Sequence, residues 1–448
     1  MQNKTFLINI LKNIDVLFWI SLLFLITIGM VAVYSASFNY SNPLKFVTTQ
    51  SIALMIGLVL LVFLVGFNYQ YYKHFRWPLY IFGCLLLTAV LFFGSTIKGT
   101  KGWFNFGFFS FQPVEITKII FILVLSGYLD NNRKDVEKIS LFCKCLFIML
   151  GHVFLIMLQP DFSSTLCYFP ITLALLYIAC SKITHLAAVI LYGSLALGIP
   201  LLATFLRLDT QTVQESSFLM FLLNATSSLK IALLILLALI AIVIIIKWFL
   251  NKLKISIGWT YPIIFLLIIV AGSFSSVIVD KSLKDYQRKR LIVFLKPTID
   301  SRGSGYNIIQ SKISIGSGRI RGKGFFKGTQ TQLGFLPEKR TDFIFSVIGE
   351  EGGYILAQLT ILFYFLFIWR ALVIARNARD RYGSFVAVGI AVMFAFYAII
   401  NIGMVMGCMP ITGLPLPLLS YGGSSMLSSF IAIGILLSIH IRSYVRYQ

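Results

Sequence analysis

Long apolar stretches recur along the whole chain of 448 residues, and each is about as long as a membrane-crossing helix, roughly 20 residues. In lipid, every backbone N–H and C=O group must find its hydrogen-bond partner within the protein, so only helices and closed barrels can span. The alternating pattern of barrel strands is absent from this sequence. The sequence therefore predicts an all-α fold, a polytopic transmembrane helical bundle.

About twelve spans are expected, and hydrophobic residues make up 58% of the chain, against about 45–50% in soluble domains. The expected spans are residues 14–36, 49–67, 77–96, 114–130, 139–158, 164–180, 184–205, 230–250, 259–279, 343–374, 384–408 and 421–441. Two of them, 114–130 and 164–180, are short and polar at one end, which favours tilted or partly re-entrant helices. We expect one integral membrane domain over residues 1–448.

The Lys and Arg residues of the short loops predict the orientation, because positive charge is retained on the cytoplasmic side. With the N-terminus inside, most of these cations fall inside and both termini are cytoplasmic. Residues 280–341 then form a large extracytoplasmic loop with fourteen Lys and Arg against four Asp and Glu. Loops of this length are translocated despite their charge.

This basic loop has two interpretations. It is either a solvated loop near anionic lipid headgroups, or a binding site for an anionic ligand such as a phosphate or pyrophosphate. Its glycines would let backbone N–H groups approach such an anion. A P-loop is excluded, because Ser317 and Gly324 stand where that motif needs Gly and Ser or Thr, and no GxGxxG is present. Neither nucleotide nor nucleic-acid binding is predicted.

Asp342 lies where the basic loop ends and an apolar span begins, two residues after the pair Lys339 and Arg340. At that boundary an acid faces water on one side and lipid on the other. One interpretation is a helix N-cap, for which Thr341 and Asp342 are both well suited. The other is a carboxylate that acts as a general base at the membrane surface.

Glu115 and Lys118 are polar residues in a predicted span, and their spacing of three places them on one helix face. They form either a structural ion pair, or a phosphate-binding lysine oriented by its glutamate. Trp103, in the outer loop before this span, either anchors the interface or stacks on a sugar. The six Cys and four His residues have no metal-ligand spacing, so no protein metal site is predicted.

Six motifs resemble the SEDS family (shape, elongation, division and sporulation), over nearly the whole chain. They are QPVEITK at 112–118, QPD at 159–161, DYQRKR at 285–290, GSGYNIIQSKISIGSG at 303–318, GKGFFKGTQTQLGFLPEKRTDFIFSVIGEE at 322–351 and PLPLLSYGGSS at 415–425. The stretch ending in TDF is more similar to the elongation branch than to the division branch.

The resemblance implies a peptidoglycan glycosyltransferase that polymerises lipid II at the outer face of the bacterial cytoplasmic membrane, for cell elongation and shape. It implies a class B penicillin-binding protein as the crosslinking partner. It places the catalytic acid on Asp342 and further cavity residues on Trp103, Glu115 and Lys118. Lys339, Arg340 or a divalent cation such as Mg²⁺ or Mn²⁺ would stabilise the leaving pyrophosphate.

Three features depart from the family pattern. Gly102 stands where the family usually has Arg, and Gly334 where related proteins often have Glu. Residues 206–258 form an atypical extra segment, so that about twelve spans are expected against the family's usual ten. Two alternative functions stay open from the residues alone: a flippase or transporter of the same lipid intermediate, and a non-catalytic scaffold of a wall-synthesis complex.

Overall fold

The computed structural model describes residues 15–40, 42–97, 99–107, 110–208, 216–217, 219–220, 229–252, 263, 265–274, 293–294 and 303–444. Contacts divide the chain into two units, the first made of residues 1–181 and 307–448 and the second of residues 182–306. Much of the predicted extra segment 206–258 and of the predicted loop 280–341 lies outside the described residues.

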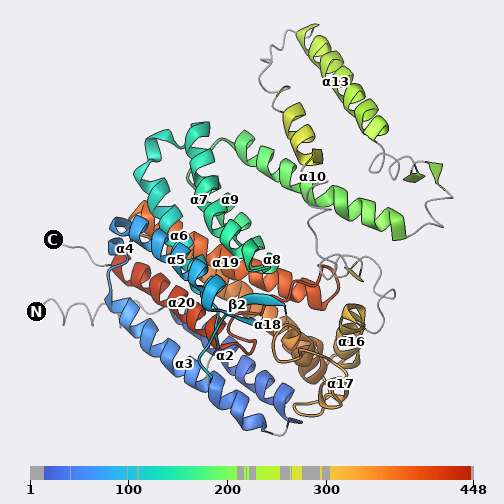
Figure 1. Cartoon of the computed structure of the whole chain (residues 1–448). Helices are drawn as coiled ribbons and strands as arrows, with labels where there is room; N and C mark the ends of the chain where they lie inside the picture. Colours follow the sequence, from blue (N-terminus) through green and yellow to red (C-terminus); the bar gives the residue numbers. More distant parts are fainter. Residues whose placement is uncertain are drawn as a thin grey trace, which may run out of the picture. The chain divides into compact units, whose positions relative to one another are not determined.

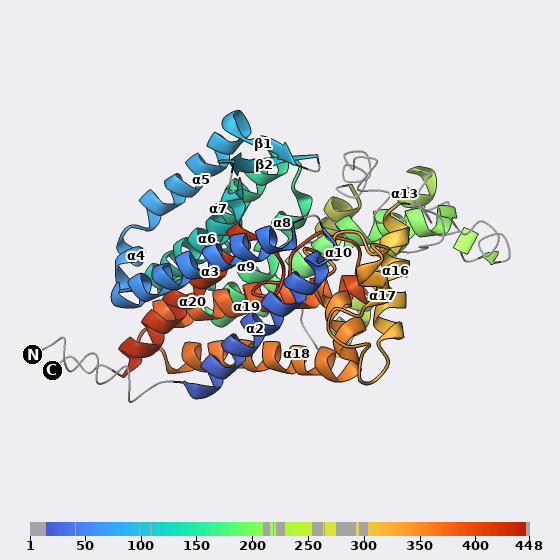
Figure 2. The same cartoon turned by 90° about the horizontal axis from the view of Figure 1, so that it is seen from below.

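The first unit is a helical bundle with a small three-stranded sheet (Figures 1 and 2). Its helices are α2 (Val16–Ser37), α3 (Pro43–Gly66), α4 (Gln70–His74), α5 (Arg76–Phe93), α6 (Pro113–Asn131), α7 (Ile139–Leu158), α8 (Phe162–Leu166), α9 (Tyr168–Ile178), α17 (Thr329–Gln332), α18 (Ile344–Asn377), α19 (Arg381–Val405) and α20 (Gly423–Ser443). The antiparallel strands are β1 (Ser95–Ile97), β2 (Thr100–Asn105) and β3 (Ser110–Phe111), and a 3₁₀ turn covers Arg133–Asp135.

The second unit contains α10 (Ile183–Leu208) and α13 (Leu229–Lys252) among its described residues. Helix α16 (Ser304–Ser317) begins in this unit and continues into the first. In the first unit, Ser311 of α16 forms hydrogen bonds with Ser346 (2.8 Å) and the carbonyl of Val405 (2.6 Å).

Helix starts follow local signals in the sequence. Asp15, Asp161 and Asp380 are N-caps whose carboxylates accept backbone N–H groups at 2.9–3.1 Å. Pro43 and Pro113 stand in the first turns of α3 and α6, where a missing N–H costs nothing. These signals separate the apolar runs into individual helices.

The prediction of a polytopic helical bundle is confirmed, and the chain is a multi-pass membrane protein. Within the described residues, eight helices are long and apolar enough to span: α2, α3, α5, α7, α10, α18, α19 and α20. The predicted number of twelve is therefore not reproduced. The span predicted at 114–130 is α6, which carries Glu115, Lys118 and Asp130, and the span at 164–180 is divided at Cys167 between α8 and α9.

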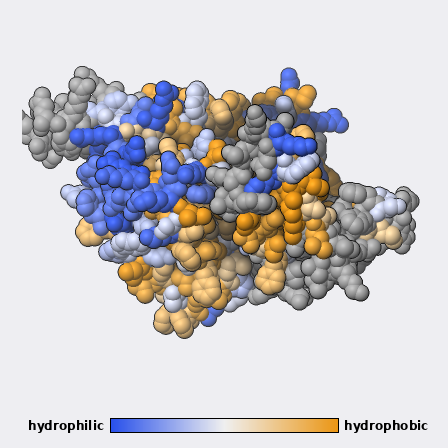
Figure 3. All heavy atoms as spheres, turned by 90° about the horizontal axis from the view of Figure 1, so that it is seen from above, coloured by the Kyte–Doolittle hydropathy of each residue, from blue (hydrophilic) through white to orange (hydrophobic). Residues whose placement is uncertain are grey.

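Helices α19 and α20 form the core of the bundle. In the most apolar stretch of α19, 67% of the residues are buried, and in that of α20, 89% are buried. The corresponding values are 22% in α3 and 17% in α5. Exposed apolar side chains cover the peripheral helices, and hydrophobic atoms form much of the visible surface in Figure 3, with hydrophilic atoms gathered towards one end. This distribution fits a surface that faces lipid.

Polar contacts gather at two ends of this bundle. At one end, Asp15 pairs with Arg370 (2.7 Å), Lys73 pairs with Asp130 (2.5 Å), and Arg442 donates to the carbonyls that end α3. The other end, called the site end below, holds the residues that start α3, α6, α18 and α20. The predicted site residues all belong to elements of the site end.

Candidate active site

Helix α19 connects the two parts of the predicted site. Its Asn401 donates from Nδ2 to the carbonyl oxygen of Asp342 at 2.8 Å, and its Tyr397 contacts both Lys118 and Glu115. Tyr397 and Asn401 are four residues apart, so they share one helix face about 6 Å apart along the axis. The backbone of the acid predicted as the base and the buried lysine therefore contact the same face of α19, at residues one helical turn apart.

Lys118 is fully buried, and its ammonium group is held by protein partners. Nζ lies 2.7 Å from Oε1 of Glu115, bonds to the hydroxyl of Tyr397, and lies 4.6 Å from the centre of that ring. The Tyr397 hydroxyl also donates to Glu115 Oε1 (3.2 Å), and Ser428 reaches Oε2 (3.5 Å). The predicted ion pair is thus present, in a buried polar cluster of four side chains.

Three successive carbonyls fix the backbone that carries Asp342. The carbonyl of Arg340 accepts from the N–H of Tyr421 (2.8 Å), that of Thr341 accepts from Ser420 Oγ (2.6 Å), and that of Asp342 accepts from Asn401. Helix α18 begins at Ile344 with Phe343 as its N-cap, so Asp342 stands one position before the cap. The backbone of half-buried Asp342 is therefore held by tertiary contacts with α19, and that of the two residues before it by the loop before α20.

An aromatic cage surrounds Arg340. Its guanidinium group lies 4.3 Å from the ring centre of Tyr40, 3.9 Å from that of Phe46 and 6.0 Å from that of Tyr421. Such contacts hold a guanidinium group by electrostatic attraction to the ring faces. Nη1 of Arg340 is buried and has no hydrogen-bond partner among the residues that the structure describes.

Lys339 is also buried, and its Nζ donates to the carbonyl of Thr331. Burial lowers the pKa of the Lys339 ammonium, and the neighbouring positive charge of Arg340 lowers it further. Thr331 is in turn fixed to α18, because Glu350 accepts from its N–H (2.9 Å) and its hydroxyl (2.7 Å). Lys339 thus links the segment before Asp342 to the short helix α17, which is anchored on α18.

Trp103 lies on β2, and β2 packs against α5 and α6. The preceding Gly102 is buried, and a Cβ at that position would lie 3.4 Å from Oε1 of Gln159, an oxygen without a hydrogen-bond partner among the described residues. Gln112 connects the end of this sheet to Asp161 (3.1 Å). The structure therefore places Trp103 at the site end, on a different element from Lys118 and Asp342.

Within the described residues, no three His, Cys, Asp or Glu side chains gather in the way that a metal site requires. Mg²⁺ often takes only one or two protein carboxylates and relies on substrate phosphates for its other ligands. The described residues thus offer no cage of protein ligands for the divalent cation considered from the sequence.

A known protein family matches nearly the whole chain. The family model for FtsW, RodA and SpoVE, described as "Cell cycle protein", matches residues 15–244 and 239–445. The chain belongs to the FtsW/RodA/SpoVE family. The resemblance to SEDS proteins is thereby confirmed.

Similar relatives of this FtsW/RodA/SpoVE member are named as enzymes. Peptidoglycan glycosyltransferase RodA of Treponema pallidum (strain Nichols) is 34% identical over 443 residues, which cover 96% of this chain and 98% of that protein. Peptidoglycan glycosyltransferase MrdB of Escherichia coli K12 is 32% identical over 385 residues, covering 86% and 83%.

Solved structures share the fold. Rod shape determining protein RodA of Thermus thermophilus matches with a TM-score of 0.58 at 20% identity, covering 96% of this chain and 97% of that one. A chain from a structure of a peptidoglycan synthase complex, which concerns the coordination of polymerization and crosslinking, matches with a TM-score of 0.62 at 23% identity, covering 94% and 97%.

One departure from the family pattern has a local cause in the backbone. Gly334 has a φ of +77°, a conformation that side-chain-bearing residues rarely adopt, and open space surrounds its missing Cβ. A glutamate at this position would be strained by the backbone, not by crowding. Gly102 and Gly334 therefore differ, because the first is buried and the second is open.

Sequence reasoning missed Tyr397, Asn401 and the ring cage around Arg340. Asn401 carried a usable signal, since an amide within an apolar span is costly unless it is hydrogen-bonded. Tyr397 lies one turn earlier on the same face, so the pair was detectable together. The cage depends on Tyr40 and Phe46, which are distant from Arg340 in sequence, and no local pattern predicts it.

We predict that Asn401→Leu loosens the Asp342 segment, because its amide serves the carbonyls of both Asp342 and Leu414 (2.7 Å). A buried carbonyl that loses its donor costs about 1–3 kcal/mol. Hydrogen exchange measured by mass spectrometry should become faster for peptides covering residues 338–345. Asn132→Leu, which removes one hydrogen bond at the end of α6, is the control and should leave these peptides unchanged. Unchanged exchange in Asn401→Leu would contradict the role given to this amide.

Proposed function

We propose that the chain is a peptidoglycan glycosyltransferase that polymerises lipid II into glycan strands for cell elongation. The observation that carries this proposal is the 34% identity to a RodA named as such an enzyme, extending over almost the full length of both chains. The geometry agrees with it, since one face of α19 contacts both the backbone of Asp342 and the buried Lys118–Glu115 pair at one end of a membrane bundle.

We assign the general base to Asp342. The acceptor is a sugar hydroxyl, which becomes an adequate nucleophile only when its proton is removed, and a carboxylate is suited to this task. Hydrogen bonds fix the backbone on which this carboxylate stands, so the base is held in place before substrate binds. We expect direct displacement with inversion, in which the hydroxyl oxygen bonds to the anomeric carbon as the pyrophosphate leaves.

Lys118 is proposed to bind the pyrophosphate of the lipid-linked sugar, with Glu115 orienting its ammonium. A cation in a buried site interacts strongly with an anion, because little water screens the pair. Phosphate oxygens would replace the Tyr397 hydroxyl as a partner of Nζ, while Oε1 of Glu115 stays bonded to it. Trp103 is proposed to stack on a sugar ring, and Lys339 and Arg340 to add positive potential beside Asp342.

The proposed partner is a class B penicillin-binding protein that crosslinks the product. The fold match to a chain of a peptidoglycan synthase complex supports this proposal, since that structure concerns both polymerization and crosslinking. We further propose that the site end faces the outside of the bacterial cytoplasmic membrane, with both chain termini in the cytoplasm. The support is that short loops rich in Lys and Arg belong to the opposite end of the bundle.

Asp342→Asn is expected to abolish polymerisation, because an amide cannot accept the proton of the sugar hydroxyl. Loss of a general base typically lowers the rate about 10²–10⁴-fold. Purified protein is given lipid II, and glycan ladders are resolved by gel electrophoresis. Glu338→Gln, which neutralises an exposed carboxylate four residues earlier, should keep near-normal ladders.

Near-normal ladders from Asp342→Asn would place the base elsewhere. The same reconstituted protein separates the rival functions. Lipid translocation without ladders by the unmodified chain would indicate a flippase, and neither activity would indicate a scaffold.

The role of Lys118 is tested by comparing a single with a double substitution. Lys118→Ala leaves Glu115 buried and unpaired, which costs about 3–5 kcal/mol, so it should lower both protein level and activity. Lys118→Met with Glu115→Gln removes both charges and should restore protein level, since replacing both members of a buried pair is often tolerated. We expect this double variant to stay inactive in the ladder assay, and recovery of activity would refute the substrate role.

The proposed orientation predicts which introduced cysteines are reached by an impermeant maleimide in intact cells. The six native cysteines are first replaced. Lys327→Cys, at the site end, should be labelled from outside, and Asn377→Cys, where α18 ends, should be labelled only after permeabilisation. Both positions are exposed, so access to the side chain is equal in the two variants. The reverse pattern would invert the orientation and the proposed side of catalysis.

A further inference from the structure

Helix α18 is interrupted at Gly353, whose φ of +67° and ψ of −166° are not helical. The whole helix of 34 residues would measure about 51 Å, well above the roughly 30 Å of a bilayer core. The part after Gly353 alone measures about 36 Å and is long enough to span with some tilt. Gly353 therefore marks one level of the membrane interface, and the part before it belongs to the site end.

Residues 317–323, called the basic turn below, are bonded to this interruption. The N–H of Tyr354 donates to the carbonyl of Arg319 (2.8 Å) and the N–H of Ile355 to that of Ile320 (3.2 Å). In the other direction, the N–H of Lys323 donates to the carbonyl of Glu350 (3.0 Å). The basic turn is thus held at the level where the spanning part of α18 begins.

The backbone of the basic turn is tightly constrained. A Cβ at Gly318 would lie 2.0 Å from the carbonyl oxygen of Gly349, and one at Gly322 would lie 2.1 Å from that of Glu351. Arg319 has a φ of +49°, a conformation in which glycine is less strained than a residue with a side chain. An arginine is therefore presented at a position where the backbone alone would favour glycine.

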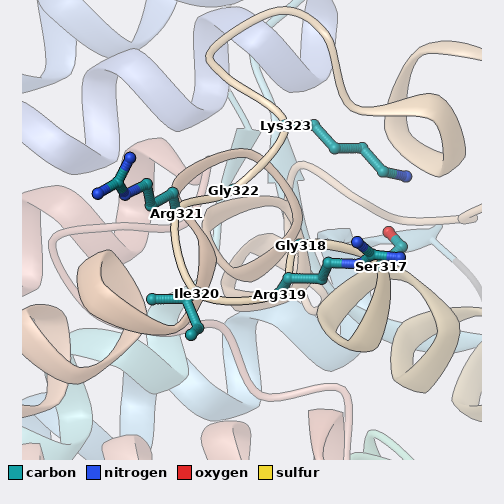
Figure 4. Close-up of a pocket in the computed structure, with 7 residues that line it drawn as sticks. All are labelled: Ser317, Gly318, Arg319, Ile320, Arg321, Gly322 and Lys323. Atoms are coloured by element: carbon teal, nitrogen blue, oxygen red, sulfur yellow. The ribbon is translucent and has the colours of Figure 1, made fainter.

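The side chains of the basic turn line a hollow of about 640 Å³ (Figure 4). Arg319 and Arg321 are exposed, and no ion pair or hydrogen bond is recorded for either side chain among the described residues. Lys323 differs, since its Nζ is bonded to Glu350 (3.0 Å) and Thr329 (2.6 Å). In Figure 4, Arg319 and Lys323 extend to one side of the turn and Arg321 to the other. The two arginines therefore supply the available positive charge.

Apolar side chains continue from the basic turn along α18. Ile320, between the two arginines, is 66% exposed. Below the interruption, Ile355, Leu359 and Leu362 are 38–48% exposed at spacings of four and three residues, which place them on one helix face. An acyl chain that follows this face would carry its headgroup to the basic turn.

We propose that the basic turn binds the phosphate groups of anionic phospholipids of the surrounding bilayer. Because Arg319 and Arg321 extend to opposite sides of the turn, each would pair with the phosphate of one lipid on its own side. Guanidinium groups match phosphate oxygens in geometry and charge. The exposed apolar residues within and below the turn favour a lipid over a free anion. The start of α18 is nine residues from Gly353, about 14 Å along the helix, so this site is separate from Asp342. The proposal does not depend on the proposed enzyme activity.

The test uses the full chain in nanodiscs of phosphatidylethanolamine with increasing phosphatidylglycerol, and counts retained phosphatidylglycerol by native mass spectrometry. Arg319→Gln with Arg321→Gln should require about tenfold more phosphatidylglycerol for the same occupancy. The matched control is Lys312→Gln with Lys327→Gln, which removes the same charge from exposed positions outside the turn and should bind like the unmodified chain. Thermal unfolding of each variant checks that the fold is intact.

Three results would overturn the proposal. If the variant Arg319→Gln with Arg321→Gln retains as much phosphatidylglycerol as the unmodified chain, the two arginines do not bind the lipid. An equal loss in the lysine control would show only general attraction between a basic surface and anionic lipid. Displacement of phosphatidylglycerol by millimolar inorganic phosphate would show an anion site that does not select a lipid. A further variant, Arg319→Lys with Arg321→Lys, keeps the two positive charges but loses the guanidinium groups. If it retains an amount of phosphatidylglycerol between those of the unmodified chain and the Gln variant, both charge and guanidinium geometry contribute to binding.

Discussion

The site end depends on hydrogen bonds that satisfy carbonyl groups inside an apolar bundle. A buried carbonyl without a donor costs about 1–3 kcal/mol, so each must be served where the chain leaves regular structure. One amide, that of Asn401, serves the carbonyls of Asp342 and Leu414 at once. It thereby fixes two irregular segments, one before α18 and one before α20, to the same turn of α19.

The same helix face also controls the buried charges. Tyr397 contacts Lys118 and Glu115 one turn from Asn401, so a displacement of α19 would move the cation and the acid together. Helix α19 thus contacts both the segment that carries Asp342 and the Lys118–Glu115 pair of α6. Burial makes this arrangement sensitive to the loss of either charge, because an unpaired charge in a low dielectric is costly.

The sequence predicted well what depends on one continuous segment. Apolar runs located the eight described helices that are long enough to span, although about twelve spans were expected. Polar residues near the ends of apolar runs singled out Asp342, Lys118 and Glu115, because a polar group in lipid is costly unless it has a role. What it could not predict depends on tertiary contacts. The cage around Arg340 is built from Tyr40 and Phe46, which lie where α2 is followed by α3. The interpretation of Asp342 as a helix N-cap could be tested only once the start of α18 was known, and Phe343 occupies that position. The roles of the individual site residues stay predictions.

Because α18 is interrupted at Gly353, the side chains before and after this residue do not follow one continuous helical rotation. In an unbroken α-helix each added residue turns every later side chain by about 100°, so the site and the lipid-facing surface would share one phase. A non-helical residue between them removes that link. A change of length before Gly353 could therefore reorient the segment that follows Asp342 while Ile355, Leu359 and Leu362 still face the bilayer. Catalytic geometry and membrane fit can vary separately within a single chain element.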